Sequence, residues 1–182
     1  MHHSLSPRVR SRFTDTHWIS RDGTPVFIRP IRPADVAPLK ALFQKVKPED
    51  MRLKFFGAVN IDEKAIAQLT GATDLDTAVF IAERSDTEEI AGFAKWRKIS
   101  DVAEFAILVR SDLKNHGFGW LLMQAIIRYS IFRQIRELRG DVLAFNANML
   151  DMCRELGFAV TPSSSDPHCM SVKLDLQKPF LA

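Results

Sequence analysis

The chain has 182 residues and a formal net charge of +3; 46% of its residues are hydrophobic and 26% are charged, as in an ordinary globular domain with a full core. No apolar run approaches the roughly 20 residues that span a bilayer, and the N-terminus lacks the apolar segment of a secretory signal. The two cysteines, Cys153 and Cys169, are too few for a disulfide framework or a cysteine zinc site, so we expect a reducing, cytoplasmic location.

The first 22 residues are expected to form a flexible, basic lead-in to one domain over 23–182. Residues 1–33 hold six arginines against two aspartates. Such a segment could bind nucleic acid, but a solvated tail or linker explains the same composition. The chain lacks the interleaved aromatic and basic residues of a single-strand binder, so we expect no nucleic-acid partner.

The first structured elements are predicted to be one strand and three helices. The strand covers residues 24–33, where apolar and polar residues alternate and prolines fix the end. The three helices are predicted over 33–46, 48–57 and 61–71. Asp62 is a plausible cap of the third.

The hydrophobic period then changes from that of helices to that of strands. An antiparallel meander of three strands is predicted over 77–84, 90–98 and 102–109. The rest is predicted as a helix over 117–132, a strand over 138–146, a helix over 147–156, a loop over 161–167 and a strand over 169–176. Because the helices are segregated from a mostly antiparallel sheet, the expected fold class is α+β, a mixed sheet flanked by helices.

Two glycines mark the change from strand to helix in the segment Val109–Gly119. The segment is not a G-x-G-x-x-G loop, because Leu122 occupies the third glycine position, and no P-loop pattern occurs in the chain. Glycines would let a phosphate approach the unpaired N–H groups of a helix N-terminus. A tight turn that needs glycine conformations would explain the same residues.

This segment, V-x-x-x-x-[basic]-x-x-G-x-G after a strand, resembles the acetyl-CoA signature of the GNAT superfamily of N-acetyltransferases. Downstream, Asn146 or Asn148 followed by "MLDMCRELGF" resembles the second motif of that superfamily. The resemblance covers about residues 24–176. Four stretches are similar to the acetyltransferase domain of bacterial protein lysine acetyltransferases: "RPIRPAD" (29–35), "MRLKFFG" (51–57), "AEFAILVRSDLK" (103–114) and "NMLDMCRELGF" (148–158).

The resemblance implies the GNAT fold and direct transfer of an acetyl group from acetyl-CoA, the co-substrate, to a primary amine. A protein lysine is the expected acceptor. A small-molecule amine acetyltransferase and a non-catalytic acyl-CoA-binding regulatory domain remain alternatives, and a homodimer is left open. No metal is expected, because no metal-ligand spacing exists among the histidines and acids.

The resemblance also implies the cofactor-binding residues. Backbone N–H groups of residues 115–120 are expected to bind the pyrophosphate, while the strand edge at Ile107 and Val109 pairs with the pantetheine arm. The N–H of Val109 or its neighbour is expected to face the thioester oxygen. The full expected set is Ile107, Leu108, Val109, Lys114, Asn115, His116, Gly117, Phe118, Gly119, Trp120 and Asn148.

Glu104 is the candidate general base. It interrupts an otherwise apolar strand, and the lysine acetyltransferases that this chain resembles carry a glutamate at the matching position. The alternative is a sheet-surface glutamate paired with Lys95 or Arg97. Cys153 occupies the place where many family members have a tyrosine that protonates the leaving thiolate, and we expect it to be a small buried hydrophobe.

The acceptor is expected to approach from the side opposite CoA. The resemblance places its walls in residues 45–60 and 159–170. Within these segments Glu49, Asp50 and Asp166 could attract a cationic lysine, although solvated loop positions are the simpler expectation.

Overall fold

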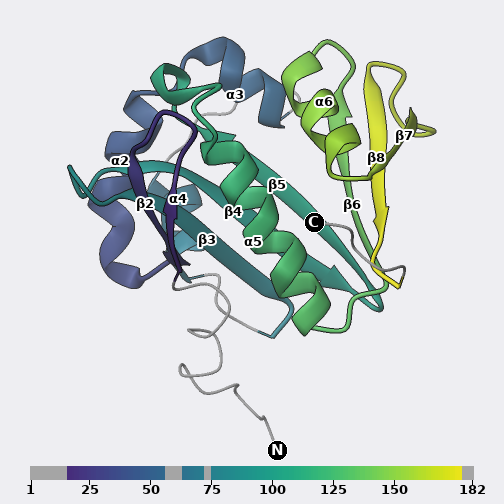
Figure 1. The fold of residues 1–182 in the computed structure, drawn as a ribbon, viewed down its shortest axis with the longest axis horizontal. Helices are drawn as coiled ribbons and strands as arrows, with labels where there is room; N and C mark the ends of the chain where they lie inside the picture. The colour runs from purple at the N-terminus through teal and green to yellow at the C-terminus, as the bar shows by residue number, and fades with distance from the viewer. Residues whose placement is uncertain (1–15, 56–62, 72–74, 178–182) are drawn as a thin grey trace, which may run out of the picture.

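An eight-stranded sheet organises the chain in the computed structural model, which describes residues 16–55, 63–71 and 75–177 (Figure 1). The strand order is β1-β2-β3-β4-β5-β6-β8-β7, and every neighbouring pair is antiparallel except β5–β6. The strands are β1 (Thr16–Ile19), β2 (Pro25–Pro30), β3 (Thr77–Arg84), β4 (Ile90–Ile99), β5 (Val102–Val109), β6 (Glu137–Leu143), β7 (Ala159–Pro162) and β8 (Cys169–Asp175).

Helices cover both faces of this sheet. Helices α5 (Phe118–Phe132) and α6 (Ala147–Glu155) pack on one face, and α2 (Val36–Gln44) and α4 (Glu63–Gly71) pack on the other. The remaining helical elements are α3 (Pro48–Phe55) and two short 3-10 turns, η1 (Pro33–Asp35) and η2 (Ser111–Leu113). No helix within the described ranges is long and apolar enough to cross a membrane.

The two-sided covering explains why the meander is apolar almost throughout. On β4, Trp96 packs in the same buried cluster as Ile126 of α5, whereas Phe93 packs in the cluster that contains Leu39 of α2. Because successive side chains of a strand point to opposite faces, a strand covered on both faces must carry apolar residues at most positions. The predicted meander and the mixed sheet are confirmed.

Two short edge strands differ from the predictions. Residues 16–22, expected to belong to a flexible lead-in, form β1 and the turn after it, while residues 1–15 lie outside the described part of the chain. Strand β7 occupies part of a segment predicted as a loop. Each has only four residues, too few for a periodic signal, and each is held by pairing with one neighbouring strand.

Element boundaries differ by a few residues elsewhere. Strand β6 ends at Leu143 rather than 146, because Asn146 caps the following helix with its side chain. The helix predicted over 33–46 begins as the 3-10 turn η1 before α2. The predicted stop at Gly57 and the cap at Asp62 lie outside the described residues.

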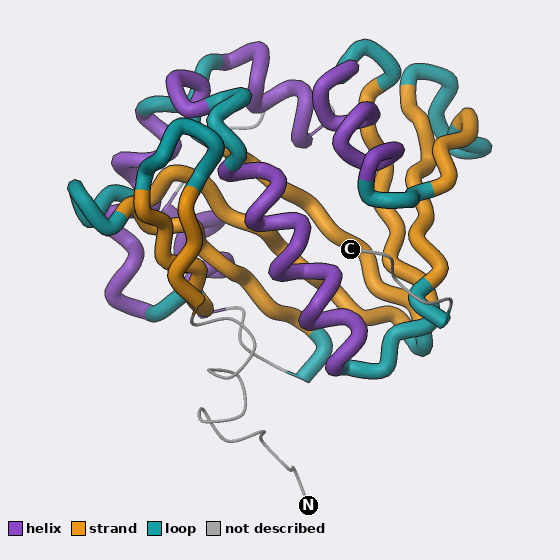
Figure 2. Tube along the Cα trace, viewed as in Figure 1, coloured by secondary structure: helices purple, strands orange, loops and turns teal. Residues whose placement is uncertain are grey.

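The one parallel pair divides the sheet. Strands β5 and β6 pair only where Val102–Glu104 faces Glu137–Arg139. Beyond this point β6 stays paired with β8 while β5 stays paired with β4, so the two strands diverge (Figure 2). The facing edges of β5 and β6 therefore have no strand partner over the rest of their length within the described structure.

A buried ion cluster joins β2, η1 and β3. The Arg29 guanidinium donates to both carboxylate oxygens of Asp35 at 2.8 Å and to Glu83 at 2.6 Å. Arg29 and Asp35 are 6% and 4% exposed. Burial alone would raise the pKa of Asp35, but hydrogen bonds from Arg29 and from the Arg32 N–H hold that pKa below its ordinary value.

Removing one partner of this cluster should destabilise the fold strongly. We expect Asp35→Asn to lower the free energy of unfolding by about 3 kcal/mol at pH 7, because it leaves the Arg29 charge buried without its main partner. Asp101→Asn, at the exposed Arg136–Asp101 pair, should cost far less, because water screens that pair. Urea unfolding measures both, and equal losses would contradict this account.

The same cluster should make stability depend on acidity. Because the folded-state pKa of Asp35 is lowered, its contribution is present above its ordinary pKa of 3.8 and is lost as the pH falls below that value toward the lowered one. The difference in unfolding free energy between wild type and Asp35→Asn should therefore be constant near neutral pH and shrink below about pH 4.

Candidate functional site

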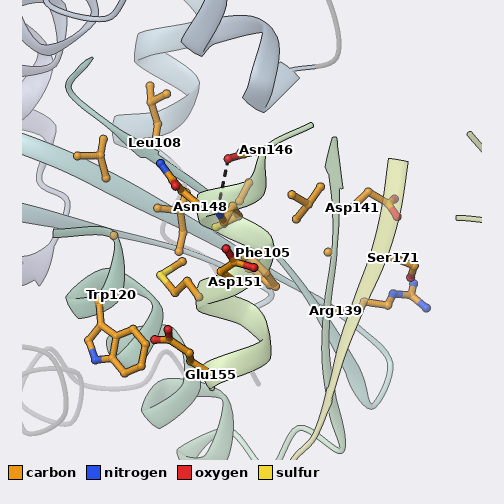
Figure 3. Close-up of a pocket in the computed structure, with 18 of the residues that line it drawn as sticks. Phe105, Leu108, Trp120, Arg139, Asp141, Asn146, Asn148, Asp151, Glu155 and Ser171 are labelled. Atoms are coloured by element: carbon orange, nitrogen blue, oxygen red, sulfur yellow. Dashed lines mark hydrogen bonds between the residues drawn. The ribbon is translucent and has the colours of Figure 1, made fainter. Parts of the chain in front are cut away.

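A large cleft opens where β5 and β6 diverge. Its volume is about 1200 Å³, and its walls come from both strands, the η2–α5 segment, α6 and the β7–β8 region. Figure 3 shows Trp120 on the first turn of α5 and the side chains of Asn148, Asp151 and Glu155 along α6. The candidate site is therefore a product of the divided sheet.

The free edge of β5 forms one side of this cleft. The Arg110 N–H donates to Ala91 O at 2.8 Å, so the Arg110 backbone faces β4. Because backbone directions alternate along a strand, the N–H groups of Ile107 and Val109 point away from β4, toward the diverging β6. Leu108 faces β4 with its backbone and is only 4% exposed, so it has no free N–H to offer.

The two glycines at the start of α5 have different reasons to be glycine. Gly117 is the residue before the helix, with a φ of 95°, and a Cβ there would lie 3.0 Å from the Arg21 backbone nitrogen. The turn between β1 and β2 packs against the loop before α5 and fixes the position of Gly117, since the Arg21 N–H donates to His116 O at 2.9 Å. A Cβ on Gly119 would meet only Val109, at an ordinary 3.7 Å, and Gly119 lines the cleft.

The protein's own packing therefore explains Gly117 but not Gly119. The N–H groups at the first turn of α5 have no acceptor within the helix and carry its positive dipole end. Without a side chain at Gly119, the cleft reaches these groups. The arrangement suits an anionic group of a ligand.

Two basic side chains of this loop pair with acidic residues of other segments. Lys114 pairs with Asp50 of α3, and Ser111 donates to the other oxygen of the same carboxylate. Asp50 is 8% exposed, so the expectation of a solvated acid is wrong at this residue. Burial would raise the pKa of Asp50, but the hydrogen bonds from Lys114 and Ser111 lower it. Nδ1 of His116 lies 2.7 Å from Oδ2 of Asp22.

The two asparagines near α6 separate into different roles. Asn146 caps α6, because its side chain accepts from the Met149 N–H at 3.4 Å. Asn148 lines the cleft and donates to the side chain of Asn115 at 3.1 Å, across from the η2–α5 segment. Both asparagines line the cleft, and Asn146 is the one whose side chain is committed to the helix cap.

Glu104 lies at the last paired residue before the strands diverge and lines the cleft. Its Oε2 accepts from Arg97 at 2.8 Å and its Oε1 accepts from Arg139 at 3.1 Å. These hydrogen bonds, the one from Arg97 first, lower the pKa of Glu104 although partial burial opposes them. The pairing of Glu104 with Arg97, which was the alternative to a role as base, is present, and Glu104 lines the candidate site at the same time.

Cys153 is completely buried in the core and does not line the cleft, and burial raises the pKa of its thiol to about 12. This confirms its role as a small buried hydrophobe. The single tyrosine of the chain, Tyr129, is packed between Phe80 and Trp96. Neither side chain can reach a group bound in the cleft.

Several cleft residues were missed by sequence reasoning. They are Arg21, Arg139, Asp141, Asp151, Glu155, Ser171 and Lys173. For Arg139 and Asp141, the alternation of polar and apolar residues along β6 could have predicted this, since both occupy the face opposite the buried Leu138 and Val142. The two expected acceptor walls do reach the cleft, through Asp50 and through residues 161–165. No cluster of His, Cys, Asp or Glu in the described ranges could hold a metal ion.

Comparisons with known proteins agree with this geometry. The model of the acetyltransferase (GNAT) family matches residues 43–158. Acetyltransferase PA5475 of Pseudomonas aeruginosa is 26% identical over 152 residues, 78% of this chain and 80% of that protein.

Two solved structures share the fold. The GNAT domain of S. lividans PAT superposes with a TM-score of 0.81 at 22% identity, covering 88% of this chain and 96% of that one. The Salmonella typhimurium protein yncA, solved with acetyl-CoA, has a TM-score of 0.67 at 16% identity and covers 84% and 95%.

The two glycines should respond in opposite ways to the same added methyl group. We expect Gly117→Ala to lower the free energy of unfolding by about 1–2 kcal/mol, because a left-handed backbone is costly for alanine. Gly119→Ala should be neutral or stabilising by up to about 1 kcal/mol, because alanine favours the helix and the space is open. Urea unfolding compares the two, and equal destabilisation would show that Gly119 is needed by the fold.

Proposed function

We propose that this chain, which belongs to the acetyltransferase (GNAT) family and is an N-acetyltransferase, binds acetyl-CoA in the β5–β6 cleft and acetylates a protein lysine with Glu104 as general base. The observation that carries the proposal is the junction of three features in one cleft: free strand-edge N–H groups, an open helix N-terminus and a carboxylate.

The cleft fits the parts of acetyl-CoA. The first turn of α5, with Gly117–Trp120, offers N–H groups to the pyrophosphate, and the missing side chain of Gly119 leaves room for it. The edge of β5 offers the backbone of Ile107 and Val109 to the peptide-like pantetheine. Lys114 would reach the phosphates by exchanging its partner Asp50 for them.

Acetyl-CoA supplies a thioester whose carbonyl carbon is attacked by the amine nitrogen, so that a C–N bond forms, the C–S bond breaks and CoA leaves as a thiolate. The Val109 N–H is the preorganised donor for the charge on the carbonyl oxygen, since the backbone of the neighbouring Leu108 faces β4. The backbone direction favours Val109 over its neighbour for this role.

Glu104 prepares the acceptor. A lysine ammonium has to lose one proton before it attacks and another before the amide is complete. Glu104 takes the first of these and passes it to solvent. The second goes to the departing sulfur through water, because Cys153 and Tyr129 are both buried away from the cleft.

A protein lysine suits the open side of the site. Next to Glu104, the half-buried Arg139 of β6 and the exposed Lys173 of β8 lie on one face of the sheet, so a protein segment could lie across them. The four stretches that resemble protein lysine acetyltransferases support the same acceptor. A small-molecule amine needs no such open face.

Replacing Glu104 tests the proposal. We expect Glu104→Gln to lower the turnover number by about 10²–10⁴-fold, because the ammonium loses its base. Its affinity for acetyl-CoA should stay near that of wild type, because the phosphates bind at α5. Thiol release from acetyl-CoA measures turnover, with lysine peptides, acyl-CoA synthetases and polyamines as acceptors.

Glu137→Gln is the matched control, because Glu137 lies on β6 only two residues before Arg139, the registered neighbour of Glu104, but does not line the cleft. It should retain nearly full activity. Unchanged turnover in Glu104→Gln would remove Glu104 as the base. Tight binding of acetyl-CoA with no release for any acceptor would contradict the proposed transfer and favour a non-catalytic acyl-CoA-binding domain.

A further inference from the structure

Both oxygens of the Glu104 carboxylate are already bound by arginines. Arg97 on β4 binds Oε2 and Arg139 on β6 binds Oε1. These contacts follow from the strand register, since Arg97 and Arg139 are the direct cross-strand neighbours of Glu104 on either side. The side chains of Arg97 and Arg139 are 57% and 38% exposed, so their ion pairs are solvent-accessible and can be exchanged.

This arrangement opposes the task assigned to Glu104. A lysine ammonium that approaches Glu104 would be the third cation around one anion, and like charges at such distances repel. The two arginines also stabilise the carboxylate and so weaken it as a proton acceptor. An acceptor lysine alone cannot relieve either effect.

The charges around Glu104 show where a second anion could offset the excess of positive charge. Lys95 lies two residues from Arg97 on the same face of β4 and makes no ion pair among the described residues. Its registered neighbours on β3 and β5, Val79 and Ala106, carry no charge. The β4 side of Glu104 is therefore a pair of adjacent cations.

The acidic residues on this face of the sheet lie on β6 and β8, on the side of Glu104 away from β4. Glu137 of β6 and Asp175 of β8 are cross-strand neighbours, two residues from Arg139 and Lys173, and Asp141 lies on β6 beyond the point where β5 and β6 diverge. Lys173 of β8 is the cross-strand neighbour of Arg139, so it lies on the β8 side of Arg139. A carboxylate brought by the acceptor would find its favourable position over Lys95 and Arg97, away from these acids.

We propose that the acceptor lysine is flanked by an acidic residue, whose carboxylate binds Arg97 and Lys95 and takes Arg97 away from Glu104. The inference rests on the proposed function and names the class of lysine that the site selects. No covalent step is added: one ion pair is exchanged for another. Oε2 of Glu104 is then free to accept the ammonium proton, and a second anion offsets the cations around Glu104.

The test uses three lysine peptides that differ only at the residues beside the lysine, which are Glu, Gln or Lys. For wild type we expect kcat/KM with the Glu peptide to exceed that with the Gln peptide by about fivefold at low ionic strength, as for an exposed ion pair. The ratio should shrink at high salt. In Arg97→Gln the ratio should fall toward one, partly because the Gln peptide improves.

Three further variants separate charge recognition from a structural effect. Arg97→Glu should invert the preference toward the Lys peptide, and Lys95→Gln should weaken it without touching Glu104. Arg136→Gln removes an arginine of similar exposure, 47%, that pairs with Asp101 away from the cleft, and it should keep the wild-type ratio.

Equal rates for the three peptides in wild type would overturn the inference and leave the proposed function standing. A wild-type preference that survives unchanged in Arg97→Gln would also overturn it. If none of the peptides is acetylated while a polyamine is, the protein-lysine acceptor itself is wrong, and the inference falls with it.

Discussion

The divergence of β5 from β6 is the constraint on which the rest of the site depends. Three residues of each strand pair in parallel, and then each strand follows its other neighbour. A sheet that stayed paired would satisfy the backbone of Ile107 and Val109 internally and would close the space between the strands. Because it divides, unpaired backbone groups border a cleft, and the start of α5 opens into the same space.

Ion pairs between distant segments then hold the walls of the cleft. The pair between Lys114 and Asp50 links α3 to the loop before α5, whereas the cluster around Arg29 links β2, η1 and β3 away from the cleft. The arginines on Glu104 join β4 to β6 at the point of divergence. Exposed pairs such as those on Glu104 contribute little to stability, so their exchange for a substrate group costs little.

The sequence predicted the order and type of nearly every element, because the covered strands of the meander and the amphipathic helices have strong periods. It could not predict β1 or β7, which are short and depend on pairing. The sequence pointed to Glu104 as an acid within an apolar strand and to the two glycines at the change from strand to helix. It could not distinguish Gly117, which the turn against Arg21 requires, from Gly119, which lies open to the cleft. The sequence could not predict the role of Arg139, because that role depends on its strand register with Glu104, a contact between residues 35 positions apart.

Amide hydrogen exchange, followed residue by residue with and without acetyl-CoA, tests the central claim most directly. Slowed exchange is predicted at the N–H groups of Ile107 and Val109 and at Phe118–Trp120, with no change in β2, which lies away from the cleft. Gly119→Leu, which would fill the space at the helix start, should show no such slowing at the same ligand concentration. Unchanged exchange at Ile107 and Val109 in a wild-type protein saturated with acetyl-CoA would contradict the placement of the cofactor in the divided sheet.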